Sequence, residues 1–231
     1  AAVFHFFFWV AIGFSYDDVS TFSGGPGPVL SAIHILTLGV FAMTIMGAAT
    51  QLIPVATGLA HRSLWPTQIA WWLFLPGTLI FLTGLNFSEQ WIMQLGGLLT
   101  AAALLIFGFS IADLLRRSKV LKIPVRFAWL SMASLLVLVL LGLVLLENFI
   151  HGFLPDHQAI AASHVILALY GFMGLLLMGF SNILVPMFAL SKSPPARNQQ
   201  IAQWLAPIGL VLAVTGVLVN TEEIVGIAVV I

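Results

Sequence analysis

The chain has 231 residues, of which 61% are hydrophobic and only 7% are charged. Soluble domains carry about 25% charged residues, so this composition excludes a water-soluble globule, which needs a polar surface. The formal net charge is zero, which disfavours nucleic acid as a partner because binding to its phosphates needs a basic surface. The chain has no cysteine, which excludes disulfides and thiolate metal sites.

Eight apolar stretches predict an all-α, polytopic transmembrane helical bundle with about eight spans. In chain order, the predicted spans are residues 1–14, 29–55, 69–87, 91–115, 127–146, 159–190 and 201–219, and an eighth that begins after Glu223. A full span needs about 20 residues. The first and last stretches are shorter than this, so we expect residues to be missing at both ends of the chain.

The charged residues separate when the spans are threaded alternately through a membrane. One face receives all eight basic residues: Arg62, Arg116, Arg117, Lys119, Lys122, Arg126, Lys192 and Arg197. The other face receives seven of the eight acidic residues: Asp17, Asp18, Glu89, Glu147, Asp156, Glu222 and Glu223. Only Asp113 lies among the basic residues. Because basic loops stay in the cytoplasm, we expect the basic face inside and the acidic face outside.

Two halves of the chain resemble each other. Asp17 precedes His34 by seventeen residues, and Glu147 precedes His164 by the same seventeen. In each half, the acid follows an outward span and the histidine lies near the start of the next inward span. This spacing predicts an internal duplication in which each copy contains four spans.

The predicted copies are residues 1–126 and residues 127–231, the second being incomplete at its C-terminus. Further matches are found at a spacing of 132 residues, and they pair Gly39, Met46-Gly47 and Pro54 with Gly171, Met178-Gly179 and Pro186. The two histidines are 130 residues apart, so the alignment needs an insertion of two residues just after the histidine. An even number of spans in each copy predicts parallel repeats, related by an axis along the membrane normal.

The two matched histidines, His34 and His164, lie inside predicted spans. An ionisable side chain within a span is costly and indicates function. Each lies about 7–8 Å below the outer end of its span, at a rise of 1.5 Å per residue. Neutral imidazole is an axial ligand of haem iron, and haem propionates favour a site near a membrane face. We therefore predict that both histidines bind haem b, through one shared iron or at two separate groups. The alternative is that each hydrogen-bonds a neighbouring helix.

Small and polar residues continue the helix faces that carry these histidines. The face of His34 continues through Thr37, Phe41, Thr44, Ala48 and Gln51, and that of His164 through Ala168, Gly171, Gly174, Met178 and Ser181. Small residues leave room for a flat group or for the backbone of a neighbouring helix. We expect Thr37, Gly171 and Gly174 to line the cofactor.

The other four histidines are weaker candidates. His151 and His157 lie in an outer loop with two acids, where they predict either a copper or zinc site or a solvated polar loop. His5 lies deep in the first span, as expected of a third metal ligand or a member of a proton relay. His61 adjoins Arg62 at the inner surface, where a solvated flank is expected.

The histidine-bearing spans resemble those of a known superfamily. The residues that carry the likeness run from Ala32 through His34 to Gly39, then Met46-Gly47, Gln51 to Val55, and Gly58. A second block runs from Ser163-His164 through Gly171 and Met178-Gly179 to Pro186. Together these blocks cover about 60 residues and resemble the haem-copper oxidase subunit I-like superfamily, including its small members and the NnrS family of haem- and copper-containing membrane proteins.

The resemblance implies that His34 and His164 ligate haem toward the outer side. Oxygen-reducing members carry adjacent paired histidines, and no His-His pair occurs here, which disfavours oxygen reduction. The resemblance implies an oxidoreductase-like or electron-transport role in a respiratory or nitric-oxide-related system of a bacterial or archaeal plasma membrane. Expected partners are the lipid bilayer, a redox protein or quinone, and other membrane subunits. The alternatives are a transporter or channel and a non-catalytic anchor subunit of a larger respiratory complex.

Overall fold

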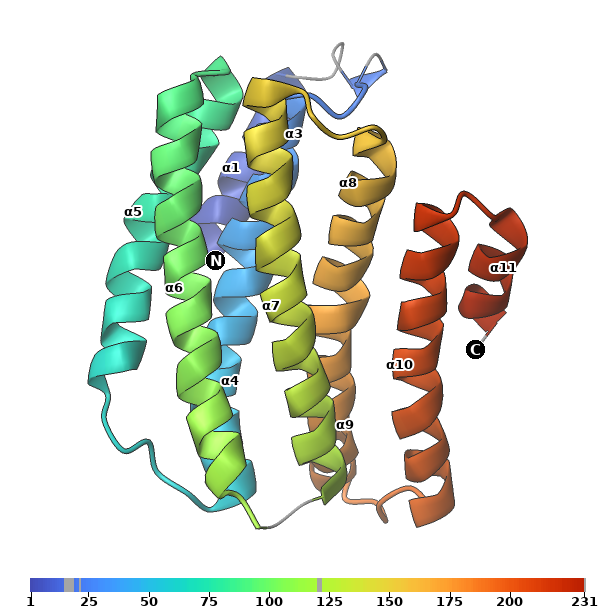
Figure 1. Ribbon diagram of the computed structural model, residues 1–231. Coiled ribbons are helices and arrows are strands. Elements are labelled where there is room, and N and C mark those ends of the chain that lie inside the picture. Colours follow the sequence, from blue (N-terminus) through green and yellow to red (C-terminus); the bar gives the residue numbers. More distant parts are fainter. Residues whose placement is uncertain (15–18, 21, 120–121, 231) are drawn as a thin grey trace. The chain divides into compact units, whose positions relative to one another are not determined.

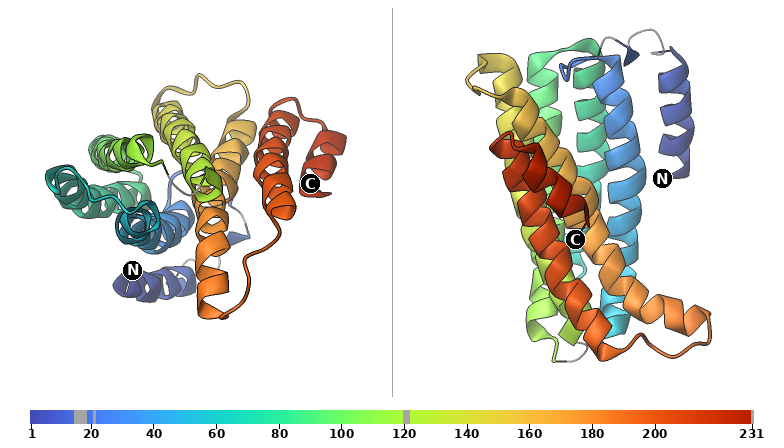
Figure 2. Two further views of the ribbon diagram at one scale, coloured as in Figure 1. Left: turned by 90° about the horizontal axis from the view of Figure 1, so that it is seen from below. Right: turned by 90° about the vertical axis from the view of Figure 1, so that its right-hand side faces the viewer.

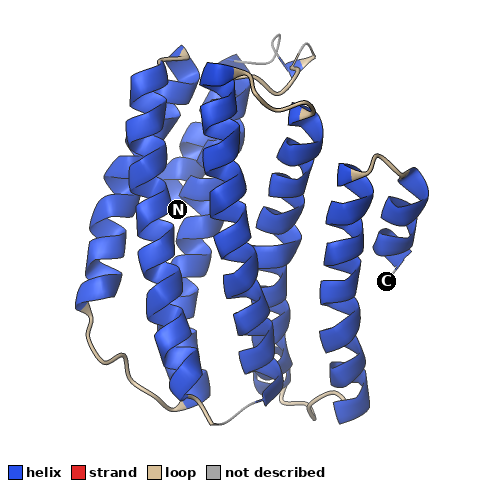
Figure 3. Ribbon diagram, viewed as in Figure 1, coloured by secondary structure: helices blue, strands red, loops and turns tan. Residues whose placement is uncertain are grey.

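A computed structural model describes residues 1–14, 19–20, 22–119 and 122–230, and every regular element among them is a helix (Figure 3). Asp17 and Asp18 lie outside these residues. The elements, labelled in Figure 1, are α1 (Ala2–Phe14), α3 (Pro28–His34), η1 (Ile35–Ala42), α4 (Met43–Thr57), α5 (Trp65–Phe87), α6 (Gln90–Arg117), α7 (Lys122–His151), α8 (His157–Ile166), η2 (Leu167–Gly174), α9 (Leu175–Phe188), α10 (Ala196–Leu218) and α11 (Glu222–Val230).

Six helical stretches of the described chain are long and apolar enough to cross a membrane. They are Pro28–Thr57, Trp65–Phe87, Gln90–Arg117, Ile123–His151, His157–Phe188 and Ala196–Leu218. The predicted second to seventh spans coincide with these stretches to within a few residues at either end. The prediction of a helical integral membrane protein is therefore confirmed.

The predicted first and eighth spans fall on shorter helices. α1 has 13 residues and rises about 20 Å, and α11 has nine, so neither covers a hydrocarbon core of about 30 Å by itself. Among the described elements, α1 packs against α3 and η1, and α11 folds back alongside α10 (Figure 2).

The helices form two compact units. Unit 1 comprises Ala1–Ala49, Ser63–Phe107 and Gly142–His157, and unit 2 comprises Thr50–Arg62, Gly108–Leu141 and Gln158–Ile231. All eight basic residues of the sequence belong to unit 2, whereas the charged side chains of unit 1 are all acidic. This grouping by contacts is a different division from the predicted sequence repeat with its boundary at residue 126, which stays a prediction.

In unit 1, glycines bring α5 and α6 close together. Gly77 faces the backbone of Thr100, and a methyl group there would come within 2.9 Å of the Thr100 nitrogen. Gly84 faces Met93, and Gly96 faces the backbone of Phe81. From one pair to the next, the residue numbers rise along α5 while those of the facing residues in α6 fall, so the two helices are antiparallel. Small residues are what allow two helix backbones to approach this closely in a membrane.

In unit 2, α7 packs along the histidine-bearing rod formed by α8, η2 and α9. The Ser131 hydroxyl donates a hydrogen bond of 2.6 Å to the carbonyl of Phe172. Gly171 lies against the Ser134 side chain, and Gly179 lies against Phe127. The Ser131 hydroxyl thus pairs with the backbone of the neighbouring rod, as polar groups must where water is excluded.

The exceptional acid, Asp113, lies among arginines of unit 2. Its carboxylate is 3.1 Å from Arg117, 3.2 Å from Arg116 and 3.7 Å from Arg62. Arg117 also donates to the carbonyl of Ala60, at 3.1 Å, and so ties the end of α6 to the loop that follows α4. Because three guanidinium groups surround this carboxylate, the region stays positively charged overall.

Candidate functional site

Each of the two predicted ligand histidines lies next to a π-helix. η1 begins at Ile35, directly after His34, and η2 begins at Leu167, three residues after His164. Both segments have eight residues. π-helices are rare, usually amount to a single turn, and are frequent at functional sites. A long π segment beside a histidine in each of two spans is the most unusual backbone feature of the described chain.

His34 lies in unit 1 and is held by its own helix. Its Nδ1 is 2.9 Å from the carbonyl oxygen of Leu30, one turn earlier. The edge of its ring meets Phe81 of α5, with ring centroids 5.4 Å apart and planes at 87°. The side chain is half-buried and lies six residues, or about 9 Å, from the start of α3. The helix and Phe81 together fix the orientation of this imidazole.

His164 lies in unit 2 and bonds a neighbouring helix. Its Nδ1 is 3.1 Å from the carbonyl oxygen of Leu138 in α7. Like His34 it is half-buried, and it lies seven residues, or about 10 Å, from the start of α8. The two histidines therefore have similar depth within their rods.

These hydrogen bonds determine which nitrogen of each histidine carries the proton. A carbonyl oxygen only accepts, so Nδ1 is the donor in both His34 and His164. A neutral imidazole with its proton on Nδ1 has its lone pair on Nε2. Metal-bound histidines usually hold their second nitrogen in this way, by donating to a carbonyl or a carboxylate. The donor chemistry of both side chains therefore fits an axial haem ligand. The same bonds also satisfy the alternative that each histidine bonds a backbone.

The straight helix faces expected around these histidines do not continue past the π segments. A π-helix has more residues per turn than an α-helix, so the spacing of three and four residues fails from Ile35 to Ala42 and from Leu167 to Gly174. The predicted faces are therefore wrong beyond those points. Sequence periodicity did not reveal the π segments, because it assumes one uniform helix.

The three predicted lining residues differ in their surroundings. Gly171 is covered by α7, since a Cβ there would lie 2.8 Å from the Ser134 Cβ. This glycine makes room for a helix, the alternative stated for such small residues. At Gly174 only its own rod comes within 4 Å of a Cβ position, the nearest atom being the Leu169 oxygen at 3.0 Å. Thr37 lies within η1 and is half-buried.

His157 belongs to a hydrogen-bonded corner between α7 and α8. The Asn148 side-chain oxygen accepts a bond of 2.7 Å from the backbone N–H of Leu154, which turns the amide nitrogen toward His157 Nδ1 at 3.0 Å. The ring also contacts Phe149, at a centroid distance of 5.1 Å. Because Nδ1 accepts here, the proton of the neutral ring lies on Nε2. This tautomer suits a structural corner better than a metal ligand.

The remaining histidines lie apart from the π segments. His151 is exposed and is 3.5 Å from the carboxylate of Glu147. His5 is exposed on α1, and its Nε2 accepts a hydrogen bond of 2.9 Å from Trp9. His61 is half-buried, with its Nε2 shielded from solvent. Among the described residues, no three His, Asp or Glu side chains gather as a group that would hold a metal ion.

Sequence reasoning missed the residues that support these histidines. The carbonyls of Leu30 and Leu138 come from apolar residues whose sequence carries no signal of this role. Ser131 and Ser134 did leave a signal, because two hydroxyls three residues apart in an apolar span mark one polar stripe on a helix. That stripe faces η2. No protein-family profile, curated protein or solved structure matches the chain.

Proposed function

We propose that this protein is a haem b-binding integral membrane protein that transfers electrons or handles a diatomic gas, with His34 and His164 as the haem ligands. The observation that supports this most is that both histidines lie next to a π-helix and that both imidazoles donate through Nδ1 to a backbone carbonyl. When bound, haem would supply a redox-active iron able to coordinate a small ligand. The role of the chain is to hold each ring in one orientation with Nε2 as the ligand atom.

An internal duplication supports treating the two histidines as equivalent. Adding 132 to the limits of η1, residues 35 and 42, gives 167 and 174, the limits of η2. This is the spacing that relates Pro54 to Pro186, whereas the histidines are 130 apart. The two additional residues, Val165 and Ile166, lie between His164 and η2. The proposal therefore includes two parallel four-span repeats, with α1 and α11 belonging to the first and eighth spans.

Haem content is the decisive measurement. Protein purified from a haem-replete host should give a Soret band and a haem b pyridine haemochrome. His34→Ala and His164→Ala should each abolish the band if both bind one iron, or each remove about half of it if there are two groups. A wild-type protein with no Soret shift between its oxidised and dithionite-reduced forms contradicts the proposal.

Matched controls are His5→Ala and His151→Ala, which remove exposed histidines of the same chemistry. Both variants should keep the full haem content, and metal analysis of the same samples tests whether copper is present. Equal losses in all four variants would mean that any histidine substitution disturbs the protein. That result would leave His34 and His164 without a specific role.

A transporter is the second candidate, and the irregular backbone of the two histidine-bearing rods favours it. Both histidine-bearing rods combine a π segment with a proline inside the following helix, Pro54 in α4 and Pro186 in α9. Irregular backbone of this kind often accompanies substrate paths in carriers. Solute uptake into proteoliposomes that survives both histidine-to-alanine substitutions would favour this function over haem binding.

The proposed setting is a bacterial or archaeal plasma membrane, with the basic loops in the cytoplasm. A redox protein or quinone and further respiratory subunits are the expected partners, and an anchor subunit of a larger complex is the non-catalytic version of this function. Cysteine labelling from the outside tests the orientation. Gly24→Cys, in the acidic loop, should react in intact cells, and Lys119→Cys should react only after lysis.

A further inference from the structure

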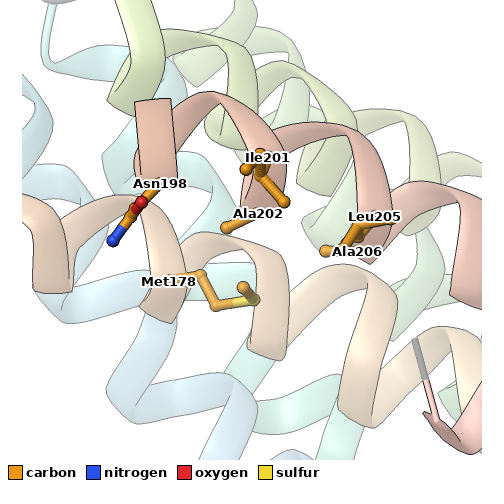
Figure 4. Close-up of a pocket in the computed structure, with 6 residues that line it drawn as sticks. All are labelled: Met178, Asn198, Ile201, Ala202, Leu205 and Ala206. Atoms are coloured by element: carbon orange, nitrogen blue, oxygen red, sulfur yellow. The ribbon is translucent and has the colours of Figure 1, made fainter. Parts of the chain in front are cut away.

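A shallow groove of about 350 Å³ lies between α9 and α10 in unit 2. Five of the residues that line it belong to α10 and one to α9, and they are Asn198, Ile201, Ala202, Leu205, Ala206 and Met178. Figure 4 shows Asn198 at one end of the row and Leu205 with Ala206 at the other. From 198 to 206 the helix rises about 12 Å, so the groove is elongated along α10.

The lining of the groove is apolar except at one end. Ile201 is 45% exposed and Leu205 38% exposed, so apolar surface lies open on a membrane-spanning helix. Ala202 and Ala206 have small side chains, which leave the space of the groove open along α10. The one polar side chain, Asn198, lies in the first turn of α10, next to the loop that precedes it. An occupant would thus be apolar along its length and polar at the loop end.

Two basic residues lie near Asn198, at the polar end of the groove. Lys192 lies in the loop between α9 and α10, and Arg197 directly precedes Asn198. The loop is held in place, since Ser191 donates through its N–H to the Pro186 carbonyl at 3.0 Å and the Gln199 side chain donates to the Pro194 carbonyl at 2.8 Å. The positive charges are therefore presented from an ordered segment.

No carboxylate in the described part of unit 2 neutralises these cations. Asp113 is already surrounded by three arginines. Glu222 and Glu223 begin α11, beyond the far end of α10, which spans roughly 34 Å. That distance exceeds the Debye length of about 8 Å at physiological salt. The end of the groove thus favours an anionic group.

We propose that this groove binds one acyl chain of an anionic phospholipid, with the lipid phosphate beside Lys192 and Arg197. Basic pockets between membrane helices bind anionic headgroups in this way. The inference is independent of haem, because none of these residues is a proposed haem ligand.

Native mass spectrometry of the full chain with phosphatidylglycerol and phosphatidylcholine of identical acyl chains tests the proposal. The wild-type protein should retain phosphatidylglycerol preferentially. Lys192→Gln and Arg197→Gln should each reduce that preference roughly fivefold. Ala202→Phe, which fills the groove, should release both lipids. The matched control Lys119→Gln removes a cation from another loop and should change nothing.

Equal retention of the two lipids by the wild type would overturn the proposal. So would a loss in Lys119→Gln as large as in Arg197→Gln, because it would mean that surface charge in general attracts the lipid. Should the protein be a dimer that Ala202→Phe dissociates, the groove takes a second copy of the chain instead. If Ala202→Phe does not fold, the two exposed cation variants still decide the matter, and Arg197→Lys should keep the preference.

Discussion

The two histidine-bearing rods, α3–η1–α4 and α8–η2–α9, are built alike but supported differently. Each contains a half-buried histidine, an eight-residue π segment and a proline in the helix that follows. In the first rod, however, the histidine donates to its own helix at Leu30. In the second it donates across to α7 at Leu138.

This difference separates what the backbone contributes from what packing contributes. The orientation of His34 depends on one turn of its own helix and on Phe81, whereas that of His164 depends on how α7 is seated. The matched glycines of the two π segments, Gly39 and Gly171, follow the same division. Gly39 is covered by Phe4 of the short helix α1, and Gly171 by Ser134 of the long helix α7. We therefore expect the second rod to be the more sensitive to changes in its neighbours.

The largest expected effect comes from filling the two glycine contacts. Gly171→Leu should lower the free energy of unfolding by about 3 kcal/mol, because the new side chain meets Ser134 on a helix packed along the whole rod. Gly39→Leu should cost about 1 kcal/mol, since the new side chain meets the Phe4 ring and Cβ and the short helix α1 can shift away as a whole. Denaturant titration in mixed micelles measures both values. A larger loss for Gly39→Leu would mean that α1 is the more rigid support.

A smaller effect is expected from two matched serines. Ser131→Ala removes the 2.6 Å bond to the Phe172 carbonyl in η2, and Ser31→Ala removes a 3.1 Å bond to the Leu82 carbonyl. Both serines are buried, and such bonds in membrane proteins contribute about 0.6 kcal/mol on average and up to about 1.7. We expect about 1 kcal/mol for Ser131→Ala and less for Ser31→Ala, by the same titration. Faster amide exchange in η2 should accompany only the Ser131 substitution.

Much of the fold could be predicted from sequence, because hydrophobic length and charge placement decide which segments enter a membrane. Six helices long and apolar enough to span were located in this way, and Asp113, expected among the basic residues, lies beside three arginines. Length alone could not establish α1 and α11 as spans. The α5–α6 glycine contacts were also missed, because a glycine in a span has the same sequence signal whether it faces lipid or a helix.

The site was predicted less completely than the fold. His34 and His164 lie at similar distances from the starts of α3 and α8, because rise per residue fixes position along a helix, and their equal depth in the membrane stays a prediction. Their hydrogen-bond acceptors are backbone carbonyls, which every residue has, so no sequence pattern could distinguish them. The π segments changed which residues share a face with each histidine. That change depends on packing and has no signal in periodicity.

The smallest effect concerns a hydroxyl that only one of the rods has. Thr44 donates a bond of 2.6 Å to the carbonyl of Val40 in η1, whereas the position 132 residues later is Leu176, which has no hydroxyl. Because η2 forms without such a bond, the hydroxyl is not needed for the π backbone. Thr44→Val should therefore change the free energy of unfolding by no more than about 0.5 kcal/mol and leave amide exchange in η1 unaltered. Markedly faster exchange across η1 would mean that the two π segments have different causes, and it would weaken the case for their common origin.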